Sequence, residues 1–220
     1  AVLKDPNIVG SFLATANTVF EGIPFLNQVI PHFLGAVFRT GDLTNFPVLI
    51  NATDADWIED IQSTPDHVAQ IDGGAILFTA SDGITKLDHE IEKYDFTTGE
   101  LIAWVKVPAL SGSNDTSIYI YYGNTILAEG ENQWNAAGVW DIDYTGVWHL
   151  KETTGGTGEI KDSNNSNHGT DYNNPTLGAD GQIDGAIDFV GTSSQYVSIP
   201  YNNLGSVLTY SMWFKKTGSG

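Results

Sequence analysis

The amino-acid sequence predicts a mainly β protein. It consists of two antiparallel β-sandwich (jelly-roll) domains, the second incomplete, behind a short apolar N-terminal segment. Short runs of β-branched and aromatic residues recur along the chain, as is typical of strands. Clusters of Gly, Asn, Asp and Ser separate these runs, and the chain contains 24 Gly. Such short strands, joined by tight turns, indicate antiparallel sandwiches.

The expected elements follow from the same pattern. One or two helical turns are expected over residues 53–62, with Thr53 as the N-cap. Residues 124–136 are rich in Gly, Asn, Glu and Gln and predict a linker or domain seam. The predicted divisions are an apolar segment over 1–38 and domains over 39–135 and 136–220. The expected strands cover residues 47–50, 75–78, 101–107, 117–122, 147–150, 186–190, 196–199 and 208–214.

The N-terminal segment is almost uncharged. Residues 6–38 contain one carboxylate, that of Glu21, and no Lys or Arg. Asp5 followed by Pro6 resembles a helix start, and apolar residues then repeat at helical spacing as far as Pro31. Two short helices are one interpretation. The other is a set of extended segments that pair with another chain.

Charge and composition exclude several classes of function. The chain has 27 Asp plus Glu against 9 Lys plus Arg, a formal net charge of −18. A nucleic-acid binder or a membrane-surface helix needs a basic face that these residues cannot supply. No apolar run is long enough to insert into a membrane. The absence of Cys, with the richness in turn residues, favours a secreted or cell-surface protein of a prokaryote.

One stretch of the sequence resembles a known family. The resemblance covers residues 41–124 and rests on five segments in order: GDLTNFPVLI (41–50), ILFTASDG (76–83), KLDHEIE (86–92), AWVKVP (103–108) and IYIYYGN (118–124). This stretch is similar to the prokaryotic domain-of-unknown-function family 2341. The resemblance implies a β-sandwich module of large surface proteins with no established activity.

Residues 138–220 are similar to the first half of a concanavalin A-like, laminin-G-type domain. The segments that carry this resemblance are GVWHL (146–150), IKDS (160–163), HGT (168–170), GAIDF (185–189), YVSI (196–199) and LTYSMWF (208–214). Such a domain needs about twice this length, so we expect either a fragment of a longer protein or a sandwich completed by residues 1–38 of this or a neighbouring chain. Family members often bind calcium and carry an acidic residue before the Tyr-Val pair, where this chain has Gln195.

Several residues are candidates for binding. Asp162, Asn164, Asn165 and Asp171 offer hard oxygen donors for calcium in an Asn-rich loop. Trp134 and Tyr172 are the aromatic residues most expected to be exposed and to stack on sugar rings. Three N-x-[ST] sequons begin at Asn51, Asn114 and Asn164.

The sequence also bears on catalysis. Glu90 and Glu92 fall on one face of an expected strand and could in principle form a glycosidase pair. A solvated strand face is the preferred interpretation, and no nucleophile elbow or phosphate loop occurs. We therefore expect a non-catalytic adhesion or glycan-binding protein that contacts a glycan or a surface protein. The alternative is a self-assembling structural subunit of an extracellular filament or sheath, joined through residues 1–38.

Overall fold

The computed structural model describes residues 29–31 (backbone only), 42–58, 68–112, 114–124, 126–127, 130–142, 144–200 and 209–216. They fall into two compact units that divide between Val139 and Trp140. We call these the N-terminal unit and the C-terminal unit. Both contain antiparallel sheets and little helix, which confirms the predicted mainly β fold class. No helix in the described part of the chain is long and apolar enough to cross a membrane.

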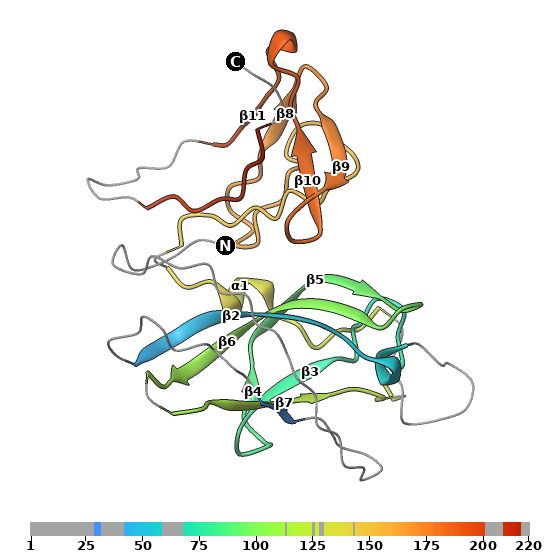
Figure 1. Cartoon of the computed structure of the whole chain (residues 1–220), viewed down its shortest axis with the longest axis vertical. Coiled ribbons are helices and arrows are strands. Elements are labelled where there is room, and N and C mark those ends of the chain that lie inside the picture. The colour runs from blue at the N-terminus through green and yellow to red at the C-terminus, as the bar shows by residue number, and fades with distance from the viewer. Residues whose placement is uncertain are drawn as a thin grey trace. The chain divides into compact units, whose positions relative to one another are not determined.

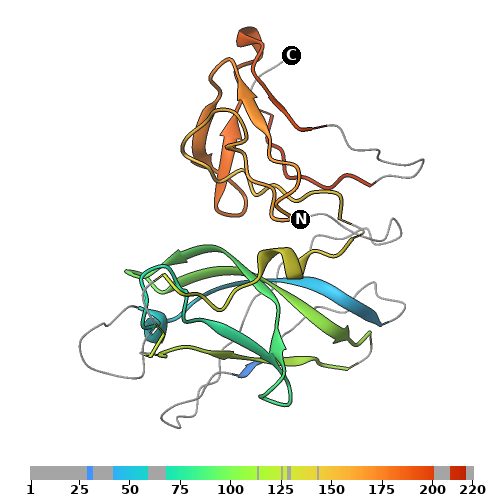
Figure 2. The same cartoon turned by 180° about the vertical axis from the view of Figure 1, so that it is seen from behind.

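Two antiparallel sheets build the N-terminal unit (Figure 1, and Figure 2 from behind). One sheet has the order β2-β6-β5, and the other has the order β1-β7-β3-β4. The strands of the first are β2 (Leu43–Thr53), β6 (Glu100–Leu110) and β5 (His89–Asp95). The strands of the second are β1 (Val29–Pro31), β7 (Ser117–Tyr121), β3 (Leu77–Ala80) and β4 (Lys86–Leu87).

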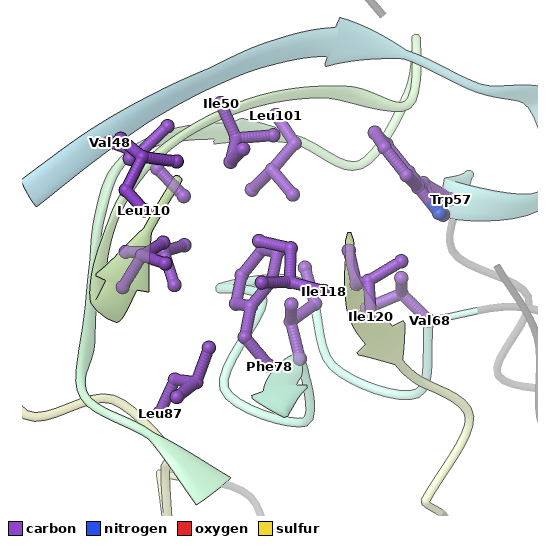
Figure 3. Close-up of a cluster of buried hydrophobic side chains, with 14 residues drawn as sticks. Val48, Ile50, Trp57, Val68, Phe78, Leu87, Leu101, Leu110, Ile118 and Ile120 are labelled. Atoms are coloured by element: carbon purple, nitrogen blue, oxygen red, sulfur yellow. The ribbon is translucent and has the colours of Figure 1, made fainter. Parts of the chain in front are cut away.

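The core of this unit lies between the two sheets. Figure 3 shows Val48, Ile50 and Leu101 from one sheet on the opposite side of the cluster from Phe78, Ile118 and Ile120 of the other. These residues occupy alternate positions of their strands and so share the face that points into the core. The intervening Leu49, Ile102 and Trp104 are also buried. Burial of this many large apolar side chains is the main source of stability for the unit.

The two edge strands of the first sheet, β2 and β5, each contain a feature that suits an edge strand. Pro47 lies in β2, opposite Lys106, and β2 has one partner among the described strands. Proline is tolerated at such an edge because its missing N–H can face away from the ladder. The opposite edge strand, β5, is irregular because its register against β6 shifts between Ile91 and Lys93. A bulge of this kind bends the strand and weakens edge-to-edge pairing.

A short segment joins the two sheets at one side. The backbone N–H of Gln133 donates to Gly74 O (2.9 Å), and that of Asn135 donates to His89 O (2.8 Å). Helix α1 (Ala136–Val139) follows, and Lys106 Nζ donates to Gly138 O. Residues in the predicted linker are therefore bonded into the N-terminal unit, and the division between units falls four residues after the predicted position 135.

The C-terminal unit contains two small sheets. β9 (Thr176–Asp180) pairs with β10 (Gly185–Asp188), and β8 (Thr170–Tyr172) pairs with β11 (Tyr196–Ser198). A 3-10 turn, η2 (Gly191–Ser193), precedes β11. The buried part of this unit includes Trp140, Tyr144, Val147 and Ile160. The rings of Trp140 and Tyr144 meet edge to face with centroids 5.3 Å apart.

Several local predictions of strands are confirmed. The expected strands over 101–107, 117–122, 186–190 and 196–199 correspond to β6, β7, β10 and β11, and residues 47–50 lie within β2. The turn after β3 also forms, because Gly83 N donates to Ala80 O and Asp82 accepts from Ile84 and Thr85. The Thr85 hydroxyl and these two N–H groups lower the pKa of Asp82 to about 2.

Two helical predictions are wrong where the structure describes them. Val29 and Ile30 belong to strand β1 instead of a helix, and the rest of the predicted N-terminal helices lies outside the described residues. Thr53 ends strand β2 instead of capping a helix. The cap is Asp54, whose carboxylate accepts from Asp56 N, and it starts only the short 3-10 turn η1 (Ala55–Trp57). Residues 59–67 lie outside the described residues.

Three strand predictions also need correction. β3 begins at Leu77, since Ile76 N is bonded to Gly73 O in the preceding turn. Residues 147–150 form a single bridge, Trp148 to Asp162, and no strand. Of the predicted strand 208–214, the described residues 209–214 form no ladder. Their large apolar side chains are exposed, so alternation alone was insufficient where no strand in the described part of the chain buries one face.

Candidate functional site

Two tyrosines form an exposed stacked pair on the C-terminal unit. Tyr172 of β8 and Tyr196 of β11 are direct cross-strand partners. Their ring centroids lie 4.8 Å apart and their planes differ by 9°. The two residues are 44% and 50% exposed, so the pair is a surface feature and not part of a core. Tyr172 was predicted from the sequence as an exposed aromatic residue, whereas Tyr196 was not singled out.

Hydroxyl side chains lie on the same face of this two-stranded sheet. Thr170 and Ser198 are the next pair with the same orientation, since side chains alternate along each strand. The Thr170 hydroxyl accepts from Gly158 N at 3.1 Å, which holds its oxygen in place. We call Thr170, Tyr172, Tyr196 and Ser198 the tyrosine surface. It offers two aromatic rings, four hydroxyl groups and no ionisable carboxylate or ammonium group.

A network of amide hydrogen bonds supports the tyrosine surface at one end. Gln195 Nε2 donates to the carbonyls of Asn173 (3.2 Å) and Asn174 (2.7 Å), and Gln195 Oε1 accepts from Val190 N. Asn173 Nδ2 donates in turn to Ser194 O at 2.6 Å. These bonds fix the residues that follow Tyr172 and precede Tyr196, so the backbone next to both rings is held by hydrogen bonds. A surface that is already ordered loses less entropy on binding.

The same network gives a role to Gln195. In this position its amide donates to two carbonyl oxygens. A carboxylate there would face the same two oxygens with no proton to donate. The Gln195 side chain therefore connects the two turns by hydrogen bonds. This role differs from the calcium-binding role that the laminin-G resemblance implies for an acidic residue at this position.

The side chains of the predicted calcium ligands make separate hydrogen bonds to the protein. The oxygens of Asp162, a buried residue, accept from the backbone N–H groups of Val147 (2.8 Å), Asn167 (3.0 Å), Asn164 (3.2 Å) and Ser166 (3.4 Å). Asn164 Nδ2 donates to Tyr144 O, and Asp171 Oδ1 accepts from Gly156 N. Asn165 Oδ1 contacts His168 Nε2 at 3.0 Å. No group of three or more His, Asp or Glu that could hold a metal occurs in the described ranges. Calcium binding stays a prediction.

Trp134 and the sequons lie in different settings. Trp134 is half-buried in the N-terminal unit, between two residues whose backbones are bonded to Gly74 and His89. It therefore does not belong to the same unit as Tyr172. Among the sequons, Asn51 is half-buried in β2, whereas Asn114 is exposed in the loop between β6 and β7. Glycosylation of Asn164 would displace the bond from its Nδ2 to Tyr144 O.

Strand β5 contains two buried ionisable side chains, those of His89 and Glu92, whose burial the sequence did not predict. The preferred interpretation of a solvated face is wrong for Glu92, which is 4% exposed and accepts a 2.6 Å bond from Trp104 Nε1. His89 is fully buried, with Nε2 3.0 Å from Ile76 O and its ring edge against Phe78. Desolvation lowers the pKa of His89. Both residues bond to neighbouring elements of the N-terminal unit, whereas the tyrosine surface belongs to the C-terminal unit.

The comparisons with known proteins agree with part of the sequence analysis. Residues 72–145 match the family model described as domain of unknown function DUF2341. This match covers β3 to β7 and the segment that closes the N-terminal unit, and it confirms the first resemblance over its overlap with residues 41–124. No curated protein and no solved structure matches the chain. The concanavalin A-like resemblance stays a prediction.

Proposed function

We propose that this chain is a non-catalytic glycan-binding or adhesion protein, and that the tyrosine surface is its ligand-binding face. The carrying observation is the exposed stack of Tyr172 and Tyr196 on ordered backbone. Aromatic faces carry partial negative charge and attract the C–H groups of a sugar ring, while hydroxyl groups bond to its oxygens.

Charge narrows the class of ligand. The chain carries a formal charge of −18, so its field repels anionic polysaccharides at low salt. The tyrosine surface has no Lys or Arg to pair with a sulfate or carboxylate. A neutral glycan is therefore the ligand that fits best.

Binding of immobilised neutral and anionic glycans by the purified chain tests this proposal. Tyr172→Ala and Tyr196→Ala should each weaken binding to a neutral glycan about tenfold, the equivalent of about 1.4 kcal/mol. Tyr210→Ala is the matched control, because Tyr210 is 72% exposed in the same unit but outside the stack. Equal losses in all three variants, or binding that survives both stack substitutions, would refute the assignment.

We place this function outside the cell, on the surface of a prokaryote. The acidic, Cys-free composition and the similarity of residues 72–145 to the DUF2341 family support this. Protease treatment of intact cells that express the protein tests the location. Loss of the protein without loss of a cytoplasmic marker is the expected result.

The C-terminal unit is proposed to be a concanavalin A-like, laminin-G-type domain. Two of its observed strands, β10 and β11, coincide with segments on which that resemblance rests. An experimental structure of this unit tests the topology.

A second candidate function is a structural subunit of an extracellular filament or sheath, assembled through residues 1–38. The observation that favours it is β1, since Val29–Pro31 of this segment pairs as an added strand with β7. Light scattering on the whole chain and on a chain lacking residues 1–38 tests it. Assemblies that form only with the segment support the filament, and a monomer at every concentration excludes it.

A further inference from the structure

Strand β1 occupies one edge of the sheet formed with β7, β3 and β4. Val29 pairs with Tyr119, Ile30 with Ile118, and Pro31 with Ser117. We propose that β1 is an exchangeable strand, so that Val29–Pro31 of one copy pairs with β7 of a second copy in this same register. This inference rests on the second candidate function and names the acceptor that it leaves open, namely the N-terminal unit instead of the C-terminal one.

The acceptor strand is held in place without β1. On its other side β7 pairs with β3 over four positions, from Leu77 opposite Tyr121 to Ala80 opposite Ile118. The side chains of Ile118 and Ile120 are buried in the core between the sheets. β7 therefore stays ordered when its outer edge is vacated, and that edge then presents unpaired N–H and C=O groups that pair with any fitting strand.

The described part of the donor strand is short. β1 pairs with three of the five residues of β7, and its described pairing leaves out Ile120 and Tyr121 on this edge. Its last residue, Pro31, has no N–H and cannot donate to the ladder. Exchange between copies costs this strand no backbone bonds in total, because the bonds it loses in one chain are regained in another.

The part of the chain that would move in an exchange ends before Asp42. Asp42 Oδ1 accepts from Gly112 N at 2.7 Å, and β2 then pairs with β6 from Leu43 onward. Ten residues, 32–41, separate this anchor from Pro31. Exchange thus leaves the sandwich from residue 42 onward intact, and what differs between the two arrangements is the effective concentration of the donor.

The charge of the donor segment also permits exchange. Residues 6–38 carry one carboxylate and no Lys or Arg, in a chain with a formal charge of −18. A donor from a second copy therefore brings little like charge to the acceptor edge. Repulsion between the two bodies still opposes association, so salt should promote it. Reciprocal exchange between two copies yields a closed dimer, and donation from each copy to the next yields an open chain of subunits.

Engineered cysteines test the register directly, since the chain has no Cys of its own. A Val29→Cys chain is mixed with a Tyr119→Cys chain, denatured, refolded together and oxidised. Direct partners in an antiparallel pair have Cβ atoms close enough for a disulfide. A covalent heterodimer on a non-reducing gel, with a yield that rises with protein concentration and salt, is the expected result. Val29→Cys mixed with Ile84→Cys, an exposed position in the β3–β4 turn, is the matched control.

The outcomes separate the inference from the function on which it rests. A chain carrying both Val29→Cys and Tyr119→Cys that closes only within itself, with no heterodimer in the mixture, overturns strand exchange. Assemblies seen by light scattering without the heterodimer also overturn it, while leaving the filament function standing through another contact. A monomer throughout overturns both. Circular dichroism checks that each variant folds, and the Ile30→Cys and Ile118→Cys pair repeats the test at the adjacent position.

Discussion

The carboxylate of Asp162 is the polar centre of the loop that closes the C-terminal unit, and its replacement gives a quantitative test. Asp162 is 3% exposed, and its two shortest bonds come from Val147 N at 2.8 Å and Asn167 N at 3.0 Å. Asn167 O in turn accepts from Trp148 Nε1. Asp162→Asn keeps the shape of the side chain, but it replaces one acceptor oxygen with an NH2 group that faces N–H donors.

The expected cost follows from these bonds. A hydrogen bond to a charged group contributes about 1.5–3 kcal/mol, and a buried donor left without an acceptor costs about 1–3 kcal/mol. Since one oxygen remains, Asp162→Asn should weaken the local structure by about 2–4 kcal/mol. Each 1.4 kcal/mol is tenfold, so amide exchange at Val147 and Asn167 should accelerate by about 30- to 700-fold.

Hydrogen exchange followed by NMR measures these amides individually and avoids treating two units as one transition. Asp180→Asn, the same charge change at an exposed position of β9, is the control and should leave both amides unchanged. Unaltered exchange at Val147 and Asn167 in Asp162→Asn would refute the structural role. A chelator that accelerates exchange in the original chain to the level of the variant would show instead that Asp162 holds calcium.

Two further substitutions test the N-terminal unit. Because burial lowers the pKa of His89, the native state favours the neutral ring, so stability is complete above the unfolded pKa of 6.5 and falls as pH drops below it. Denaturant unfolding should show a slope of at most about 1.4 kcal/mol per pH unit from this group, and His89→Gln should remove that part of the slope; an identical pH profile in the variant would count against it. Gly99→Ala should cost well over 1 kcal/mol in the same assay, since the added Cβ would lie 1.9 Å from Asp54 O in a backbone with φ of +71°. Gly130→Ala has a similar φ of +85° with nothing within 4 Å, so it isolates the backbone strain, and equal losses in the two variants would show that the contact with Asp54 is unimportant.

Richness in β-branched and aromatic residues predicted β6 and β7 correctly, because each of these strands pairs on both sides and buries one side-chain face in the core. In β6, Leu101, Ala103 and Val105 point into the core as their period of two requires. The prediction failed at residues 209–214, where the same alternation occurs but no described ladder forms. An alternating sequence indicates which face of a strand is apolar. Whether that face is buried depends on the strands that pack beside it.

The helical predictions failed for a related reason. The repeat of apolar residues up to Pro31 is compatible with a helix, yet Val29–Pro31 lies along β7. The spacing of residues within a segment carries no information about a sheet edge more than eighty residues away. Here the edge of β7 offers backbone groups that favour an added strand. Similarly, Thr53 looked like an N-cap, but its backbone pairs with Glu100 and the cap passes to Asp54.

By itself the sequence determined the mainly β class, the absence of disulfides, the acidic charge, strands β6 and β7 and the likeness to the DUF2341 family. These depend on composition, period and order, which are properties of the chain. Only the tertiary structure decided that Tyr196 stacks on Tyr172, that Glu92 is buried against Trp104, and that Asp162 accepts four backbone bonds. The first two depend on which distant residue lies opposite in a sheet, and that is set by the pairing and register of separate segments. The bonds to Asp162 depend on how its loop folds around the carboxylate and brings Val147 to it.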